Sequence, residues 1–227
     1  MKKTVIFDFG GTLDTNGIHW SVMFSDAYKK AGENIPSEIF NYAYVNADRD
    51  LKMLDKKNIK SYEDLIMKQA ELQWGYLKPE SGKDKLQKAA ENIIDEMNEN
   101  ISLSKNILTD LKKSHCLALV SNFYGNLGRM CESIDLARFF DVMIDSETEG
   151  IEKPHPGIFS IALKRLNAKP EDTFVVGDSY ERDIVPAKIL GCRTIWLKKK
   201  SFKENKITDS ADYIIGDLKE VLNICLY

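Results

Sequence analysis

The chain has 227 residues, of which 43% are hydrophobic and 30% are charged, and these ordinary values exclude a disordered or collagen-like protein. Lys and Arg number 32 against 35 Asp and Glu, so the net charge of -3 gives no basic surface for nucleic acid or an anionic membrane. No apolar run approaches the roughly 20 residues of a membrane helix, and the four cysteines show no C-x-x-C spacing. We therefore expect a cytoplasmic protein without a secretory leader, either a monomer or a homodimer, with no nucleic-acid or membrane partner.

The chain begins with a strand pattern and then changes to helical patterns. The β-branched and aromatic residues 4–7 predict a strand that ends at Asp8, and Gly10-Gly11 break it. Apolar residues spaced three and four apart then predict four helices, with Trp20 and other aromatic residues in the bundle core. These helices cover residues 20–31, 39–54, 61–72 and 86–97. Because no strand pattern lies among them, we expect residues 15–99 to form an inserted helical cap domain.

Strand and helix patterns alternate after residue 100. A short helix is predicted at 107–111, and helical patterns separate most of the later strands. The predicted strands lie at 116–120, 142–144, 173–176, 194–197 and 213–215. They are continuous apolar runs, which is typical of a mainly parallel sheet covered by helices on both faces. We therefore predict an α/β fold in which residues 1–14 and 100–227 form a three-layer core, and we expect the cap to move about linkers at 14–19 and 98–104.

Polar residues directly follow three of the predicted strands. Asp8 follows the first strand, Ser121 the second, and Gly177-Asp178 the strand at 173–176. Because ligands bind at the carboxyl ends of the strands in an open parallel sheet, we expect these side chains to share one edge. Carboxylates at close quarters repel one another unless a cation lies between them, and Mg²⁺ prefers oxygen ligands. The sequence therefore predicts a magnesium site at this edge.

Two further residues fit such a site. Asp183 lies five residues after Asp178 and is placed to supply a third carboxylate. Lys153, in the proline-rich segment after the predicted strand at 142–144, would balance carboxylate and phosphoryl charge.

The ordered set of residues resembles the motifs of haloacid dehalogenase-superfamily hydrolases of the phosphatase-like kind. That family carries D-x-D-x-T at the first strand, then Ser or Thr, then Lys, then G-D-x-x-x-x-D. The corresponding segments here are Asp8-Phe9-Gly10-Gly11-Thr12, Ser121-Asn122, Lys153-Pro154 and Gly177-Asp178 through Asp183. Each motif alone is weak, and the specificity comes from all four in order. The resemblance covers a Rossmann-like core, and the predicted bundle falls where family members carry a helical cap.

The resemblance implies a Mg²⁺-dependent phosphatase acting on a small phosphorylated metabolite. Asp8 would be the nucleophile that forms an aspartyl-phosphate. The metal ligands would be Asp8, the backbone carbonyl of Gly10, Asp178 and Asp183. The phosphate would be bound by Ser121, Asn122, Lys153 and Gly11, and Ser121 and Lys153 would also act in catalysis.

One position departs from the family pattern. The second Asp of the first motif is Gly10 here, so the backbone carbonyl remains but the general acid–base side chain is missing. Such a group contributes roughly 10²–10⁴-fold in rate. We therefore expect weak activity on alkyl phosphates and better activity on acyl, aryl or pyrophosphate leaving groups. Asp14 is the first candidate for a substitute acid, and Tyr180 is the second.

Gly10 leaves two other functions open. Phosphonate-cleaving relatives carry a small residue at this position and form a Schiff base with a cap lysine, and a phosphate- or metal-binding pseudoenzyme would need no acid at all. Dehalogenases instead place a bulky aromatic residue there and use no metal, so the retained Asp178 and Asp183 argue against dehalogenation.

Overall fold

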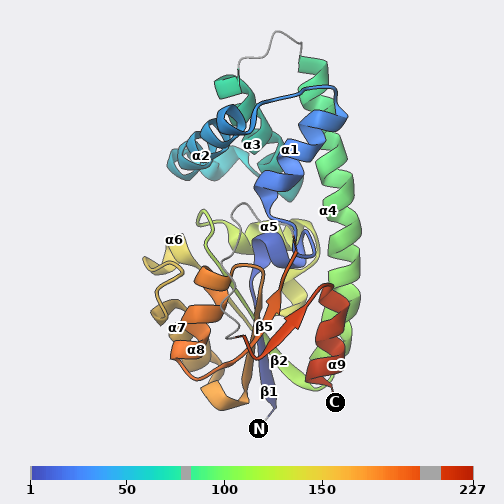
Figure 1. The fold of residues 1–227 in the computed structure, drawn as a ribbon. Coiled ribbons are helices and arrows are strands. Elements are labelled where there is room, and N and C mark those ends of the chain that lie inside the picture. Colours follow the sequence, from blue (N-terminus) through green and yellow to red (C-terminus); the bar gives the residue numbers. More distant parts are fainter. Residues whose placement is uncertain (1, 78–82, 200–210, 227) are drawn as a thin grey trace.

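The computed structural model describes residues 2–77, 83–199 and 211–226, and its core is a six-stranded parallel sheet with the order β3-β2-β1-β4-β5-β6 (Figure 1). The six strands are β1 (Lys3–Phe7), β2 (His115–Ser121), β3 (Val142–Asp145), β4 (Thr173–Gly177), β5 (Arg193–Leu197) and β6 (Tyr213–Ile215). Every strand predicted from an apolar run is present, and all pairs in the sheet are parallel. The predicted α/β class is therefore confirmed.

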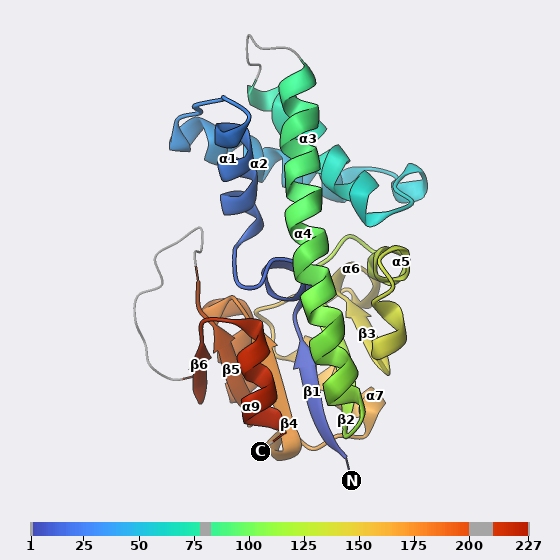
Figure 2. The same cartoon turned by 90° about the vertical axis from the view of Figure 1, so that its right-hand side faces the viewer.

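Helices cover both faces of this sheet, as Figure 2 shows from the side of α4 and α9. Along β1, Val5 and Phe7 join the hydrophobic cluster that includes α4 and α9, while Ile6 joins a second cluster that includes α7. This alternation places one layer of helices on each face, which gives the predicted three layers. The helices of the core are α5 (Leu127–Ser133), α6 (Ser146–Glu149), α7 (Gly157–Leu166), α8 (Val185–Ile189) and α9 (Val221–Cys225).

Four helices follow β1 (Figure 1), and they make up the segment called the cap below; its assignment as a separate inserted domain stays a prediction. They are α1 (Trp20–Lys30), α2 (Ser37–Met53), α3 (Tyr62–Leu77) and α4 (Lys83–Lys112). The predicted linker at 98–104 is wrong, because α4 continues unbroken from the cap into the core. Its buried positions Met97, Ile101, Ser104 and Leu108 keep helical spacing across that segment, and no Gly or Pro interrupts it. The predicted helices at 86–97 and 107–111 are therefore one helix.

Within the described segments, no helix combines the length and the apolar character that a bilayer crossing requires.

Candidate active site

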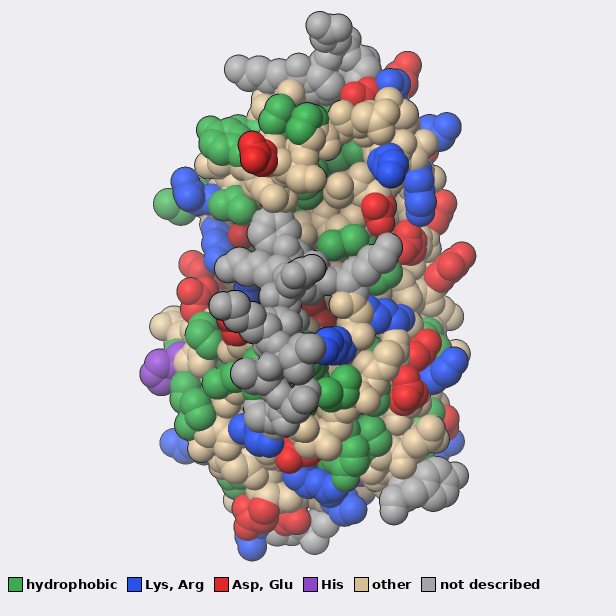
Figure 3. All heavy atoms as spheres, viewed as in Figure 1, with side chains coloured by type: hydrophobic (Ala, Val, Ile, Leu, Met, Phe, Trp, Pro, Cys, Tyr) green, Lys and Arg blue, Asp and Glu red, His purple; other side chains and the backbone are tan. Residues whose placement is uncertain are grey.

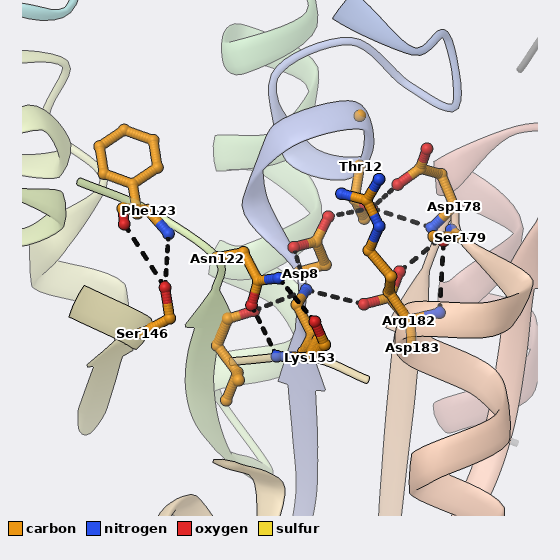
Figure 4. A network of polar contacts seen from close by, with 12 residues as sticks. Asp8, Thr12, Asn122, Phe123, Ser146, Lys153, Asp178, Ser179, Arg182 and Asp183 are labelled. Atoms are coloured by element: carbon orange, nitrogen blue, oxygen red, sulfur yellow. Dashed lines mark hydrogen bonds and ion pairs between the residues drawn. The ribbon is translucent and has the colours of Figure 1, made fainter. Parts of the chain in front are cut away.

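Side chains from three neighbouring strands meet at the carboxyl edge of the sheet. Asp8 follows β1, Ser121 ends β2 and Asp178 follows β4, and β1 pairs with both β2 and β4. Asp8, Ser121 and Asp178 are all buried. The structure thus brings these residues to one edge, as the positions of the strands predict, and Figure 4 shows the polar contacts around Asp8.

Lys153 lies at the centre of this group. Its Nζ is 2.5 Å from Oδ1 of Asp8 and 2.7 Å from Oδ1 of Asp183, and it also donates to the carbonyl oxygen of Val120 at 3.2 Å. Burial by itself would lower the pKa of Lys153, but the carboxylates of Asp183 and Asp8 raise it above its ordinary value. The ammonium is therefore a permanent positive charge that holds two carboxylates.

The carboxylates of Asp8, Asp178 and Asp183 each offer an oxygen within 4.8 Å of the others. Burial raises the pKa of Asp178 well above its ordinary value, and the charges of Asp8 and Asp183 raise it further. Burial also raises the pKa of Asp183, to about 6, against the lowering effect of Lys153. When all three carboxyl groups are ionised, they carry two more negative charges than the ammonium of Lys153 balances, and a cation among them would favour that ionised state. This donor set fits a hard divalent cation such as Mg²⁺.

The Asp8 loop (residues 8–13) fits closely against the segment that carries Asp178. Gly11 has a φ of 96°, and a Cβ there would lie 2.6 Å from the carboxylate of Asp178, so only glycine fits. The hydroxyl of Thr12 donates to Oδ2 of Asp8 at 3.1 Å and accepts the backbone N–H of Asp178, also at 3.1 Å. With Lys153 on Oδ1, both oxygens of the Asp8 carboxylate are held in place.

Two residues that the sequence assigns to phosphate binding have other partners in this structure. The Asn122 amide accepts the backbone N–H of Lys153 at 2.8 Å and donates to the carbonyl of Lys153 at 2.9 Å, so it fixes the lysine backbone. The N–H of Gly11 donates to Oδ1 of Asp14 at 2.8 Å. A contact of Asn122 or Gly11 with phosphate stays a prediction.

Asp14, the first candidate for a substitute acid, is fully buried. Besides the N–H of Gly11, its carboxylate accepts hydrogen bonds at Oδ2 from Nε1 of Trp20 and from the hydroxyl of Tyr62, both at 2.7 Å. Burial raises the pKa of Asp14 to about 7, although these donors act to lower it. The described hydrogen bonds of Asp14 lead to the cap and the Asp8 loop, and its action as an acid stays a prediction.

The second candidate, Tyr180, packs its ring against Trp196, with the ring centroids 5.2 Å apart. Its action as an acid likewise stays a prediction.

Asp145 is a site-ordering residue that the sequence analysis missed. It ends β3, the strand next to β2, and is buried. Its carboxylate accepts the backbone N–H groups of Gly125 and Leu127, in the segment after β2, and that of Glu147 in α6. Asp145 therefore orders the segment directly after Ser121. The sequence contained the signal, because Asp145 follows the apolar run 142–144 as Asp8 follows its own strand.

The cap contacts the core through polar groups at this edge. Tyr124, in the loop after β2, donates to Oδ1 of Asp48 in α2 at 2.6 Å, and the backbone N–H of Tyr62 donates to Ser133 at 3.0 Å. None of the cap lysines that the structure describes is buried. The space-filling view in Figure 3 shows Lys and Arg side chains scattered over the visible surface of the cap.

The sequence matches known protein families over most of its length. A family model for haloacid dehalogenase-like hydrolases matches residues 2–191. The chain is 35% identical over 125 residues to the glyceraldehyde 3-phosphate phosphatase of Pyrococcus furiosus, an alignment that covers 53% of this chain and 51% of the relative. It is 32% identical over 111 residues to the phosphoserine phosphatase of Thermus thermophilus, covering 48% of this chain and 44% of the relative. The matched part thus spans about half the length of these curated relatives.

The fold also matches solved structures over nearly the whole chain. One is a hydrolase of the same kind from Bacillus subtilis bound to magnesium, with a TM-score of 0.61 and 18% identity, covering 100% of this chain and 99% of that one. Another is a dehalogenase with an intermediate complex, with a TM-score of 0.62 and 16% identity, covering 98% and 96%. At these identities the likeness shows the fold alone.

Proposed function

The chain belongs to the haloacid dehalogenase-like hydrolases, and from this premise we propose that it is a Mg²⁺-dependent phosphatase for a small phosphorylated metabolite, with Asp8 as the nucleophile. The observation that carries the proposal is the Asp8 carboxylate itself. It is held by Lys153 at one oxygen and by Thr12 at the other, beside the carboxylates of Asp178 and Asp183. The relatives named as phosphatases support phosphate-ester chemistry, although the chain covers only about half of their length.

The chemistry follows from the positions of these groups. A carboxylate oxygen of Asp8 attacks phosphorus, the bond from phosphorus to the leaving oxygen breaks, and water then attacks the aspartyl-phosphate to release phosphate and free Asp8. The ammonium of Lys153 and the hydroxyl of Ser121 would stabilise the phosphoryl oxygens. Mg²⁺, held by Asp8, Asp178, Asp183 and the carbonyl of Gly10, would withdraw charge from the same oxygens.

Gly10 restricts the leaving group in this proposal. An alkoxide leaving group needs a proton as the bond to phosphorus breaks, and Gly10 has no side chain to supply one. Acyl, aryl and phosphate leaving groups are stable as anions and need less protonation. The enzyme would therefore be fast on activated phosphates and slow on alkyl esters.

The test compares hydrolysis of acetyl phosphate with hydrolysis of a sugar phosphate, each with Mg²⁺ and with excess EDTA. We expect kcat/KM for acetyl phosphate to be at least about 10²-fold higher, in line with the missing acid–base group, and both activities to disappear in EDTA and in Asp8→Asn. Equal, fast rates would refute the restriction on the leaving group. If the protein binds Mg²⁺ but hydrolyses none of these phosphates, it is a metal-binding pseudoenzyme and not a phosphatase.

No observation favours the phosphonate-cleaving alternative over the phosphatase, because that chemistry needs a cap lysine at the site and no described cap lysine contacts Asp8, Asp178 or Asp183. Inactivation by borohydride in the presence of phosphonoacetaldehyde would revive it, since borohydride traps a Schiff base.

A further inference from the structure

Asp14 joins three structural elements through hydrogen bonds to its carboxylate. Its carboxylate binds the backbone N–H of Gly11 in the Asp8 loop, the indole of Trp20 at the start of α1, and the hydroxyl of Tyr62 at the start of α3. We propose that Asp14 is a positioning residue through which docking of the cap fixes the backbone of the Asp8 loop. The inference rests on the proposed function in taking Asp8 as the nucleophile.

The groups around Asp14 use both of its side-chain oxygens as hydrogen-bond acceptors. The backbone N–H of Gly11 and the indole N–H of Trp20 can only donate hydrogen bonds, and they bind different oxygens of the carboxylate. Asp14 is 0% exposed, so water does not compete for these oxygens. Both oxygens of a buried carboxyl group need hydrogen-bond partners, so the loss of one donor leaves an oxygen without compensation for its desolvation.

The aromatic rings of Trp20 and Tyr62 also connect the cap to the Asp8 loop. Phe9 in the loop meets Tyr62 edge to face with centroids 5.5 Å apart, and Trp20 meets Tyr62 in the same way at 6.2 Å. All three rings are buried. Helices α1 and α3 therefore contact the loop through an aromatic cluster that surrounds the polar contacts of Asp14, so the cap and the loop move together or lose both sets of contacts.

On the core side, Gly11 transmits the position of Asp14 to the acidic cluster. Its N–H donates to Asp14, and its Cα faces the carboxylate of Asp178 so closely that an added Cβ would lie 2.6 Å from that carboxylate. Gly11 therefore lies between the side chains of Asp14 and Asp178, at a place where only a residue without a side chain fits. The hydrogen bond from the Gly11 N–H to Asp14 therefore fixes the position of the Asp8 loop relative to Asp178.

A second contact between cap and core provides a matched control. Tyr124 donates to Asp48 in α2 at 2.6 Å, and neither residue makes a described hydrogen bond to the Asp8 loop. In both places a tyrosine hydroxyl donates to an aspartate across the boundary between cap and core. Tyr62→Phe and Tyr124→Phe each remove one such hydroxyl. General loosening of the cap affects both variants, whereas coupling through Asp14 affects only Tyr62→Phe.

The experiment measures amide hydrogen exchange of the full chain at peptides covering residues 9–13. In Tyr62→Phe we expect exchange of this segment to be about five-fold faster, the effect of losing one hydrogen bond from the network, although the partner of Gly11 is untouched. Tyr124→Phe should leave this segment as in the wild type. On acetyl phosphate, Tyr62→Phe should lower kcat about five-fold with a smaller change in KM, because the misplaced loop acts on the chemical step.

Unchanged exchange in Tyr62→Phe, or equal acceleration in Tyr62→Phe and Tyr124→Phe, would overturn the coupling. If the wild type hydrolyses no phosphate, the proposed function fails, and the exchange comparison still decides whether Asp14 couples the cap to the loop. Asp14→Asn is the more severe variant, and the two tyrosine variants keep the test valid where that change prevents folding.

Discussion

The indole of Trp20 lies beside Gly10, and a Cβ built on Gly10 would be 3.7 Å from Nε1 of Trp20. This is an ordinary van der Waals distance, and the φ of -73° at Gly10 is one that any residue adopts. Gly10, where the resemblance predicts the second Asp of the motif, therefore has room for a Cβ, next to an indole N–H that donates to Asp14.

Gly10→Asp should restore the missing acid–base group. The new side chain has room for its Cβ beside Trp20 and follows Asp8 by two residues, as in the family motif. We expect kcat/KM for a sugar phosphate to rise by about 10²-fold, the lower end of the general acid–base contribution, while acetyl phosphate hydrolysis changes little. Steady-state kinetics on both substrates measures the difference.

Gly10→Asn is the matched control, since it has the same shape without an ionisable proton. It should give no gain on the sugar phosphate. If Gly10→Asp also gives none, another group of this chain already protonates the leaving oxygen.

Lys153→Met should lower both stability and activity. Lys153 holds Asp8 and Asp183, and all three side chains are buried. Removing one partner of a buried ion pair leaves uncompensated charge and costs about 3–5 kcal/mol. Urea unfolding without Mg²⁺ should show this loss, and hydrolysis should fall to the background rate. Lys52→Met, which removes an exposed lysine 4.0 Å from Glu152, should change the unfolding free energy by less than about 0.5 kcal/mol. Similar losses of unfolding free energy in Lys153→Met and Lys52→Met would contradict a stabilising role of the buried Lys153 ion pairs.

Mg²⁺ should stabilise the protein through the acidic cluster. A ligand at about 100 times its Kd adds about 2.7 kcal/mol to the unfolding free energy and raises Tm by roughly 5–10 °C in a chain of this size. Asp178→Asn should abolish this rise, because it removes one of the three carboxylates. Asp145→Asn should keep it, because Asp145 binds backbone N–H groups outside the cluster. A Mg²⁺-dependent rise that survives in Asp178→Asn would place the ion elsewhere.

The sequence was sufficient for the sheet and for the edge at which the candidate site lies. Strands of a parallel sheet are buried on both faces, so their apolar runs stand out, and Asp8, Ser121 and Asp178 lie at the ends of these runs. The helix α9 was missed because it spans only Val221–Cys225 and has no full amphipathic period. The continuity of α4 was missed because Ser104 interrupts the apolar pattern, although it lies inside the helix and donates to the carbonyl of Leu13 at 2.6 Å.

The contacts around Asp14 were out of reach of the sequence. Trp20 was predicted only as part of the bundle core, and Tyr62 lies 48 residues from Asp14. Which polar atoms of these aromatic side chains meet one carboxylate depends on how α1 and α3 pack on the Asp8 loop. The spacing of residues along the chain does not predict how these helices pack. The order of the strands and motifs can be predicted because it does not depend on helix packing.

Asp14 should make the stability of the protein depend on pH. Burial raises its pKa from 3.8 to about 7, and the charge of Asp8 acts in the same direction, while the donors Tyr62 and Trp20 act against it. Between pH 4 and 7 the folded state therefore binds a proton that the unfolded state has lost, so the unfolding free energy falls as the pH rises and levels off above 7. The full effect is about 4 kcal/mol at most, since each pKa unit corresponds to about 1.4 kcal/mol.

Urea unfolding of the wild type and Asp14→Asn between pH 4 and 8, with saturating Mg²⁺, measures this contribution. The carboxylates of the acidic cluster titrate in both proteins, so the difference between the two pH profiles isolates Asp14. We expect the variant to lose less stability than the wild type as the pH rises from 4 to 7, and the exposed change Asp26→Asn in α1 to reproduce the wild-type profile. Parallel profiles for the wild type and Asp14→Asn would show that Asp14 is ionised throughout this range, held so by its three donors.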